Sequence, residues 1–533
     1  MGTGNKLLWF RRHPFLGLVL AIALIAAGLA DASLAVAGGN SGSGSSGKGG
    51  GTASTLSPPP RTGGSIVNND AAIRLGKALF WDEQSGGDGR IACATCHFHA
   101  GADNRVVNTL HPGPDGIFDS GGVRGPGQRF TPANIVNDDR VGSQGIASSK
   151  FVEIRPGNAV DNCMAVDDPI FHDNRRTTGR NTPPMINAVF NRQNFWDGRA
   201  NDNFNGNDPF GNTANQLGHI GKTVTNSSLA SQSVGPPNNP VEMSCDGRVF
   251  NGPGSLGAKM LSLTPLGRQQ VSRQDSALGG LSNWPGNGLT KSYSELITDA
   301  YGATWGTTAA VQAANFSRIW GEAVQAYVST LISDQAPFDR YMEGDRSALT
   351  SNQQRGLDRF NGKGQCAKCH AGRELTDASI SFYNENGPTN EDGGDQGFHN
   401  TGVRPAKEDA GRAGLGPNGA SFSESGSEVD NGAFKTPSLH NVGLRAPHFH
   451  NGGKKDLEAV VDFYDRGGDF PHASKRVKPM GFSSEDKAAL VDFLQNGLTD
   501  CRVAREEAPF DHPSIDPPNG VFIPATGGSH TCK

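Results

Sequence analysis

Hydrophobic side chains recur at helical spacing in only a few segments of this chain. The clearest is residues 315–332, where Ile319, Ala323, Tyr327 and Leu331 return every fourth position, as on one face of an α-helix. Similar patterns predict shorter helices at 71–80, 352–360, 456–464 and 484–496. The fold class we expect is therefore mainly α.

The rest of the chain has the composition of loops. Its 533 residues include 73 Gly and 32 Pro, which leaves little room for long helices or an extensive sheet. The stretches 96–182 and 199–232 are polar, rich in Gly, Asn and Asp, and contain no motif that we can interpret. At this length we expect at least two domains, with long irregular loops.

The N-terminus has the pattern of a secretory signal. Three cations precede an uncharged run at 15–30, and small residues at 35–37 offer a cleavage site. The run is shorter than the roughly 20 apolar residues that span a bilayer. We expect residues 1–37 to be a signal peptide and the protein to be exported, for example to the periplasm; an uncleaved membrane anchor is the alternative. Residues 38–64, mostly Gly, Ser, Pro and Thr, predict a flexible linker.

Charge excludes one class of partner. Cleavage of the signal removes three cations and one carboxylate, which takes the net charge from −5 to −7. An acidic chain is poorly suited to the phosphate backbone of nucleic acid.

Two pentapeptides carry the chemistry. They are Cys93-Ala94-Thr95-Cys96-His97 and Cys366-Ala367-Lys368-Cys369-His370, and each matches the C-x-x-C-H signature of covalent c-type haem attachment. The two thiols bond one haem, and the adjacent imidazole is the proximal ligand of its iron. We expect two haems; the alternative is a redox or zinc Cys-x-x-Cys pair followed by His by chance.

Four cysteines remain, Cys163, Cys245, Cys501 and Cys532. An even remainder in an exported chain suggests two disulfides. Pairing Cys163 with Cys245 and Cys501 with Cys532 keeps each bridge within one region, although free or differently paired thiols are also compatible with the sequence.

The chain repeats itself after each haem motif. T-P-x-x-x-N occurs at 182–187 and again at 436–441, and F-x-[DN]-G follows at 195–198 and at 449–452. This order indicates a duplicated haem-binding unit. We expect an N-terminal haem domain at 65–335, and a C-terminal haem domain at 336–533 that includes a C-terminal extension.

These motifs together resemble the bacterial di-haem cytochrome c peroxidase/MauG family over about residues 68–500. The resemblance implies two cytochrome-c-like domains, with an N-terminal haem that reacts with hydrogen peroxide and a C-terminal haem that exchanges electrons. Besides the haem sites it rests on G-K-A-L-F at 76–80, N-T-P at 181–183, F-W-D-G-R at 195–199, N-P-V-E-M at 239–243, P-F-D-R-Y at 337–341 and A-P-H-F-H at 446–450.

The resemblance also assigns the peroxide site. Glu242 matches the family's catalytic glutamate, Gln232 its pocket glutamine, and Pro236 a proline that crowds the distal face. A carboxylate suits this chemistry because a proton must move between the two peroxide oxygens. Without the resemblance, Glu242 is an ordinary surface acid. Trp196 matches the tryptophan placed between the haems, where it relays charge; a core aromatic is the alternative.

At the second haem the chain departs from the ordinary family pattern. The position of the usual methionine ligand holds Tyr464, and the nearest methionine, Met480, lies 16 residues further on. Tyrosinate is a hard ligand that favours ferric and higher states. The alternative is that Tyr464 only packs on its helix.

Two further ligand assignments follow from the resemblance. Asn181, Arg445 and Pro447 match a calcium site between the domains, with Arg445 replacing a smaller residue. His172 lies near the usual position of a removable distal histidine, and a solvent-facing loop histidine is an equal alternative.

The leading interpretation is an exported di-haem peroxidase that reduces hydrogen peroxide with electrons from a small cytochrome c or cupredoxin. One alternative is a MauG-like oxidase, which oxidises a protein or organic substrate through a high-valent di-haem state. A pure electron-transfer protein would have no use for Glu242 beside an open iron. A dioxygen-using polyisoprene oxygenase fits the retained Gln232 and Glu242 less well.

Overall fold

The computed structural model describes residues 56–119, 125–129 and 137–528. They belong to one compact unit, Ser54–Lys533. The predicted signal peptide and most of the predicted linker lie outside the described residues. Among the described residues, no helix is both long and apolar enough to cross a membrane.

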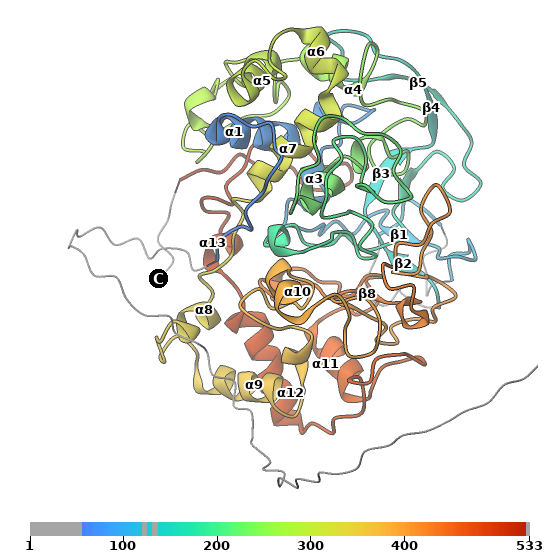
Figure 1. The fold of residues 1–533 in the computed structure, drawn as a ribbon, viewed down its shortest axis with the longest axis vertical. Coiled ribbons are helices and arrows are strands. Elements are labelled where there is room, and N and C mark those ends of the chain that lie inside the picture. The colour runs from blue at the N-terminus through green and yellow to red at the C-terminus, as the bar shows by residue number, and fades with distance from the viewer. Residues whose placement is uncertain (1–55, 120–124, 130–136, 529–533) are drawn as a thin grey trace, which may run out of the picture. The chain divides into compact units, whose positions relative to one another are not determined.

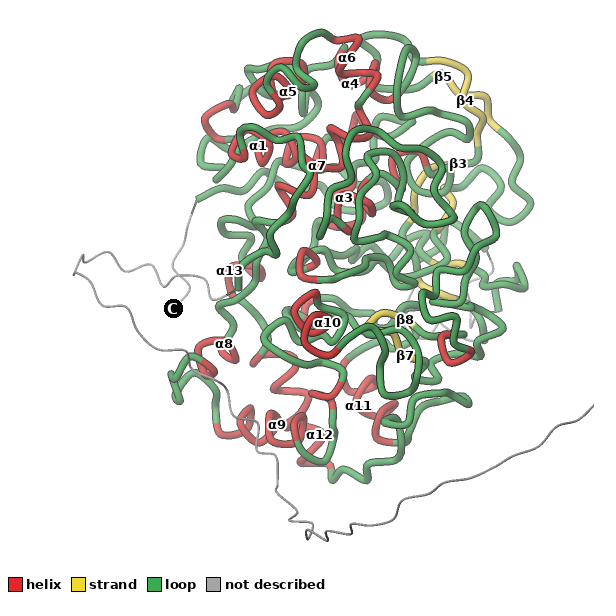
Figure 2. The backbone as a smooth tube through the Cα atoms, viewed as in Figure 1, coloured by secondary structure: helices red, strands yellow, loops and turns green. Residues whose placement is uncertain are grey.

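Short helices joined by loops make up the fold, as the tube in Figure 2 shows. The helices are α1 (Asn69–Trp81), α2 (Cys93–His97), α3 (Ser228–Ser233), α4 (Leu256–Leu261), α5 (Tyr293–Tyr301), α6 (Ala309–Ala314), α7 (Phe316–Val328), α8 (Pro337–Met342), α9 (Ser351–Asn361), α10 (Ile380–Asn386), α11 (Leu457–Asp465), α12 (Ser484–Asp492) and α13 (Cys501–Ala504). All five predicted helices are confirmed, as α1, α7, α9, α11 and α12.

The strands of the described residues form four small antiparallel ribbons. They pair as β1 (Leu110–His111) with β2 (Arg140–Val141), β3 (Gln144–Ala147) with β6 (Arg175–Thr177), β4 (Ser149–Glu153) with β5 (Asn162–Ala165), and β7 (Phe398–His399) with β8 (Phe434–Lys435). The first three ribbons lie in the 96–182 stretch, whose polar sequence gave no strand signal.

The first hydrophobic core forms around α1 and α7. Helix α1 begins after Asn68, whose side chain accepts a hydrogen bond from the Ala71 amide at 3.1 Å. The two helices approach so closely that a Cβ on Gly76 would lie 1.9 Å from the carbonyl oxygen of Ala323. Trp81 Nε1 donates to the Tyr327 hydroxyl at 2.9 Å and links the helices at a buried point. In Figure 1 these helices lie beside α5, in a different part of the ribbon from α9, α11 and α12.

The second core contains α9, α11 and α12. It repeats two details of the first. A Cβ on Gly356 of α9 would lie 2.2 Å from Ala489 O of α12. The ring of Phe360, four residues after that glycine, is 6.5 Å from the ring of His370, just as Phe80 is 6.4 Å from His97.

Both ends of the described chain pack on the first core. Leu56 is buried there, and the carbonyl of Gly63 accepts a hydrogen bond from Arg318 at 3.1 Å. Residues 56–64, the last part of the predicted flexible linker, therefore contact the first core. At the other end, Asp511 pairs with buried Lys77 at 3.0 Å. The C-terminal extension, assigned by sequence to the second domain, thus packs against the first core.

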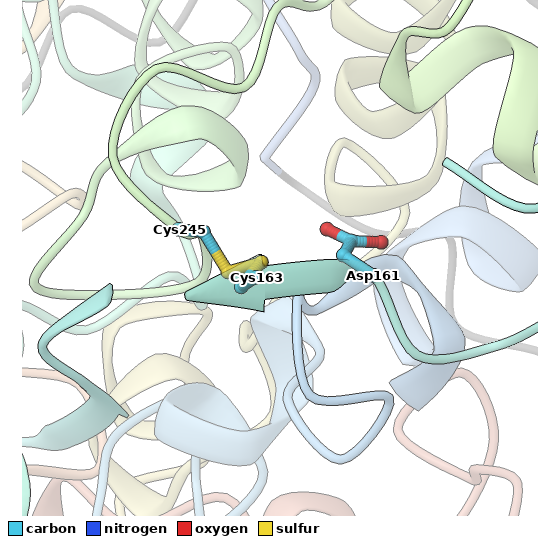
Figure 3. A group of neighbouring side chains, drawn as sticks. All are labelled: Asp161, Cys163 and Cys245. Atoms are coloured by element: carbon cyan, nitrogen blue, oxygen red, sulfur yellow. A yellow bond between two sulfur atoms is a disulfide. The ribbon is translucent and has the colours of Figure 1, made fainter. Parts of the chain in front are cut away.

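The predicted Cys163–Cys245 disulfide is confirmed. Figure 3 shows Cys163 on β5 reaching across to Cys245 in a loop. Asp161, Cys163 and Cys245 lie close enough together to suggest a metal site, but both sulfurs are bonded to each other. The second expected bridge involves Cys532, which lies outside the described residues.

Candidate functional site

The first haem motif forms the short helix α2 at the edge of a cavity. Nδ1 of His97 lies 3.0 Å from the carbonyl oxygen of Gly101, an arrangement that makes Nδ1 the protonated nitrogen and leaves Nε2 to bind a metal. Burial lowers the pKa of His97, so the imidazole is neutral, which is the ligating form.

The thiols of this motif are not activated. Burial raises the pKa of Cys93 and of Cys96 to about 12, whereas redox-active cysteines sit where the thiolate is stabilised. Cys366 has the same property, with a pKa raised by burial to about 12. This environment favours thioether attachment to haem over the redox alternative.

A cavity of about 600 Å³ lies beside His97. It brings together most of the residues that the sequence assigned to peroxide chemistry. Its lining includes Cys96, His97, Trp196, Gln232, Pro236 and Glu242.

Glu242 is held by its backbone. Asn239 Oδ1 accepts hydrogen bonds from the amides of Val241, at 2.8 Å, and Glu242, at 3.3 Å. Strand β3 lies against the same segment, where a Cβ on Gly145 would be 2.0 Å from Val241 O. The carboxylate of Glu242 accepts no hydrogen bond from any described residue, and burial raises its pKa above the usual value, opposed by the charge of Arg199. The carboxyl group is therefore suited to take up and release a proton.

The Glu242 loop is also covalently tethered. Cys245, three residues on, is bonded to Cys163, and the Met243 carbonyl accepts a hydrogen bond from Gly87 N at 2.7 Å. Near the disulfide, Asp161 forms buried ion pairs with Arg248 and Lys259, both at 2.7 Å. The 96–182 insertion thus braces the loop that carries Glu242.

A chain of ion pairs closes the same cavity. Arg180 binds Asp197 and Asp409, with Nη to Oδ distances of 2.6 Å in both cases, and Arg199 binds Asp197 at 2.7 Å. Asp409 belongs to the second half of the chain, and Leu415 and Phe422 from the same loop also line the cavity. Sequence reasoning missed these residues, because no motif or periodicity marks this loop.

The second haem motif lines a separate cavity of about 200 Å³. His370 Nδ1 lies 3.2 Å from Pro437 O and 3.3 Å from Leu375 O, which again leaves Nε2 to bind a metal. Burial lowers the pKa of His370. Both Tyr464 and Met480 line this cavity, so its lining alone does not choose between them. Burial raises the pKa of Tyr464, and the phenol is neutral unless a metal binds its oxygen.

The wall of the second cavity carries two cations, Lys435, which is buried, and Arg445, which is partly buried. The ammonium of Lys435 has no hydrogen-bond or ion-pair partner among the described residues. Arg445 donates only to the carbonyl oxygens of Asn441, Ser438 and His440, at 3.3, 3.0 and 3.1 Å. A haem brings two propionate carboxylates, so these unpaired cations, two free thiols and an available imidazole fit that group. Sequence reasoning missed Lys435, although it directly precedes the second T-P-x-x-x-N motif.

Trp196 lines both cavities. It is only 8% exposed, and its Nε1 donates to Asn181 O at 2.8 Å. The ring of His450 lies 6.4 Å from it, and His450 stacks on Phe434 at 3.5 Å. Burial lowers the pKa of His450 to about 3. A neutral aromatic group therefore lies between the two cavities.

The residues of the expected calcium site are brought together only in part. The side-chain Nδ2 of Asn181 donates a hydrogen bond to the carbonyl oxygen of Pro447 at 2.8 Å, so these two residues are adjacent. His172 is exposed, has a φ of +51° and lines neither large cavity.

Comparisons with known proteins point to one family. The family sequence model described as "Di-haem cytochrome c peroxidase" matches residues 70–347. The cytochrome-c peroxidase IdrP2 of Denitromonas iodatirespirans is 36% identical over 34% of this chain and 48% of its own length. The methylamine utilization protein MauG of Methylorubrum extorquens is 34% identical over 32% of this chain and 42% of its own.

The chain thus spans less than half the length of these two relatives. Among solved structures, a MauG-like protein associated with microbial copper homeostasis has a TM-score of 0.47 at 20% identity, covering 86% of this chain and 97% of that one. Because the family model covers more than half of the sequence and includes α2, Trp196 and Glu242, this chain belongs to the di-haem cytochrome c peroxidase family.

Proposed function

We propose that this protein is an exported di-haem peroxidase that reduces hydrogen peroxide to water. The observation that carries the proposal is the shared cavity of His97, Gln232 and Glu242, separated by Trp196 from a second cavity with His370. In this proposal the Cys93/Cys96 and Cys366/Cys369 pairs each hold one haem. The haem in the first cavity, when bound, supplies the iron that accepts peroxide and passes it two electrons.

The chain's own residues manage the protons. Glu242 takes a proton from one peroxide oxygen and returns it to the other, so that the O–O bond breaks with loss of water. Its raised pKa makes both steps accessible. The Oε1 atom of Gln232 accepts a hydrogen bond from Phe195 N at 3.3 Å, which leaves its amide NH₂ to orient the ligand. The overall balance is one hydrogen peroxide, two protons and two electrons to two waters.

Electrons arrive through the second half of the protein. A small cytochrome c or cupredoxin is the proposed donor. A second haem held by Cys366, Cys369 and His370 would collect its electrons, and Trp196 would pass them to the first cavity. The repeated Gly–Phe–His geometry of the two cores supports two equivalent haem units, which we assign to residues 65–335 and 336–500, with the C-terminal extension bound back on the first.

A MauG-like oxidase is the second candidate, and one observation favours it. Tyr464 lines the second cavity, where an anionic oxygen ligand would stabilise oxidised iron and allow peroxide to withdraw electrons from a protein or organic substrate. Tyr464 ligation is part of this proposal, with Met480 as the rival ligand.

The third member of the proposed cofactor set is a calcium ion near Asn181, Arg445 and Pro447. Asn181 and Pro447 are adjacent, but Arg445 buries its positive charge in the same wall and would repel a second cation. Metal analysis of the purified protein, with and without a chelator, measures it directly.

The test of the proposal is peroxide consumption by the purified two-haem protein with a reduced donor. Glu242→Gln should slow turnover by about 10²–10⁴-fold, while Glu153→Gln, at an exposed site on β4, should not. Equal rates of peroxide turnover in both variants would show that Glu242 takes no part in the proton transfer.

A further inference from the structure

Lys435 is an exception among the buried cations of this protein. Buried Lys77 pairs with Asp275 at 2.8 Å and with Asp511 at 3.0 Å, and buried Lys259 pairs with Asp161 at 2.7 Å. Lys435 is only 4% exposed, yet no carboxylate among the described residues pairs with it. Burying an unpaired ammonium is costly, so the cavity it lines lacks an anion.

Arg445, which is partly buried, likewise has no carboxylate partner among the described residues. Its guanidinium is satisfied only by backbone carbonyls, which provide hydrogen bonds but no net charge. Burial lowers the pKa of Arg445 to about 10, and burial together with the charge of Arg445 lowers the pKa of Lys435 to about 8. Two cations that repel each other therefore face one cavity.

The one carboxylate whose charge acts on Lys435 already has a partner. Asp377 is the acid whose charge acts on Lys435, but its Oδ2 lies 2.7 Å from Nε2 of His399. The pKa of His399 is raised well above its usual value, mainly by Asp377 acting against burial, so this histidine is protonated and uses the charge of Asp377. The described residues supply no second anion for Lys435, and we infer that its partner comes from what fills the cavity.

Lys435 also contacts Trp196, the aromatic residue that lines both cavities. Its backbone amide donates to Trp196 O at 2.8 Å, and the preceding residue, Phe434, stacks on His450. The backbone of strand β8 therefore contacts that of Trp196, and the side chains of both residues line the second cavity. An uncompensated positive charge here would oppose removal of an electron from the Trp196 indole.

We propose that Lys435 and Arg445 form a two-cation site for the propionate carboxylates of the second haem, and that Lys435 thereby sets both the potential of that haem and the charge beside Trp196. This inference rests on the proposed function, because it requires a haem in the second cavity. Pairing neutralises Lys435 and permits charge to pass through Trp196. The two cations also favour the ferrous state, which offsets the opposite effect of a tyrosinate from Tyr464.

The test is the reduction potential of the second haem, measured by spectroelectrochemical titration of the purified holoprotein. Lys435→Met replaces the lysine with an uncharged side chain of similar length. It should lower the ferrous-to-ferric ratio at a given potential at least tenfold, which is a drop of about 59 mV in the reduction potential for one electron. Lys435→Arg should stay near the parent value. Lys407→Met, at an exposed lysine that does not line the second cavity, is the matched control and should leave both potentials unchanged.

Haem content separates the possible failures. A parent protein with a single haem in a pyridine haemochrome assay would overturn the proposed function itself. Two haems in Lys435→Met at an unchanged potential would overturn only this inference. If Lys435→Met loses the second haem while Lys435→Arg keeps it, the carboxylate site is supported, and loss from both variants would contradict it. Should Lys435→Met not fold, Arg445→Gln provides the second titration, with the same lowered potential expected and an unchanged one contradicting the inference.

Discussion

The Cys163–Cys245 disulfide should stabilise the protein and also hold Glu242 in position. The bridge joins residues separated by 82 positions. For a loop of that length, the chain-entropy model gives about 4.5 kcal/mol of stabilisation at 25 °C through restriction of the unfolded chain. Cys163→Ala combined with Cys245→Ala should therefore lower the free energy of unfolding by a few kcal/mol, with about 4.5 kcal/mol as the entropic expectation.

The functional effect follows from the position of Cys245. The hydrogen bond accepted by the Asn239 side chain and the one donated by the Gly87 amide remain in the double variant, so the loop should stay folded in water but move more freely. We expect slower peroxide turnover at unchanged haem content, because a carboxyl group that relays a proton must stay within hydrogen-bond reach of both oxygens.

The assay is denaturant unfolding followed by circular dichroism and by haem absorbance, in parallel with turnover on the same preparations. Replacing both cysteines of the bridge leaves neither of them as an unpaired thiol. Ser149→Ala on neighbouring β4 is a control that keeps the bridge. A loss of less than about 1 kcal/mol, well below the range usual for native disulfides, together with parental turnover, would refute the reasoning.

Three further predictions concern the haems and pH. Cys93→Ala with Cys96→Ala should leave one haem in a pyridine haemochrome assay, because each C-x-x-C-H motif holds its own haem; two haems in this variant would contradict the assignment. Tyr464→Met should raise the potential of the second haem in a redox titration, since sulfur favours Fe(II) where an anionic oxygen favours Fe(III), and no change would remove Tyr464 from the iron. The folded-state pKa of Glu242 is raised, so its ionised, proton-accepting form should appear, and turnover should rise, as pH increases through a value above 4.5. That pH step should be absent in Glu242→Gln, and the same substitution should not lower stability at neutral pH, where an ionised buried carboxylate is a cost.

Local sequence signals predicted the helices well. The period that marked 71–80 reflects one apolar face of α1 against the core, whereas α7, which the period at 315–332 marked, is buried on all sides. The C-x-x-C-H motifs and the Cys163–Cys245 bridge were also accessible, because they depend on residue type and order rather than on tertiary contacts.

Features that depend on contacts between residues far apart in the chain could not be predicted from the sequence. The ribbons β1 to β6 arise from polar sequence without alternation, and their pairing depends on partners up to dozens of residues away. Asp409 enters the first cavity from the second half of the chain, and no pattern near it indicates where its loop folds. Lys435 has an ordinary sequence context, and only its burial without an anion reveals it. The packing of residues 56–64 on the first core likewise depends on Arg318, a residue far along the chain.

The central claim is that the protein couples donor oxidation to peroxide reduction. The most direct measurement is the number of reduced one-electron donor molecules oxidised for each hydrogen peroxide consumed by the two-haem protein. The account predicts a ratio of two, set by the two electrons that one peroxide requires. Peroxide loss without donor oxidation, or donor oxidation without peroxide, would contradict it.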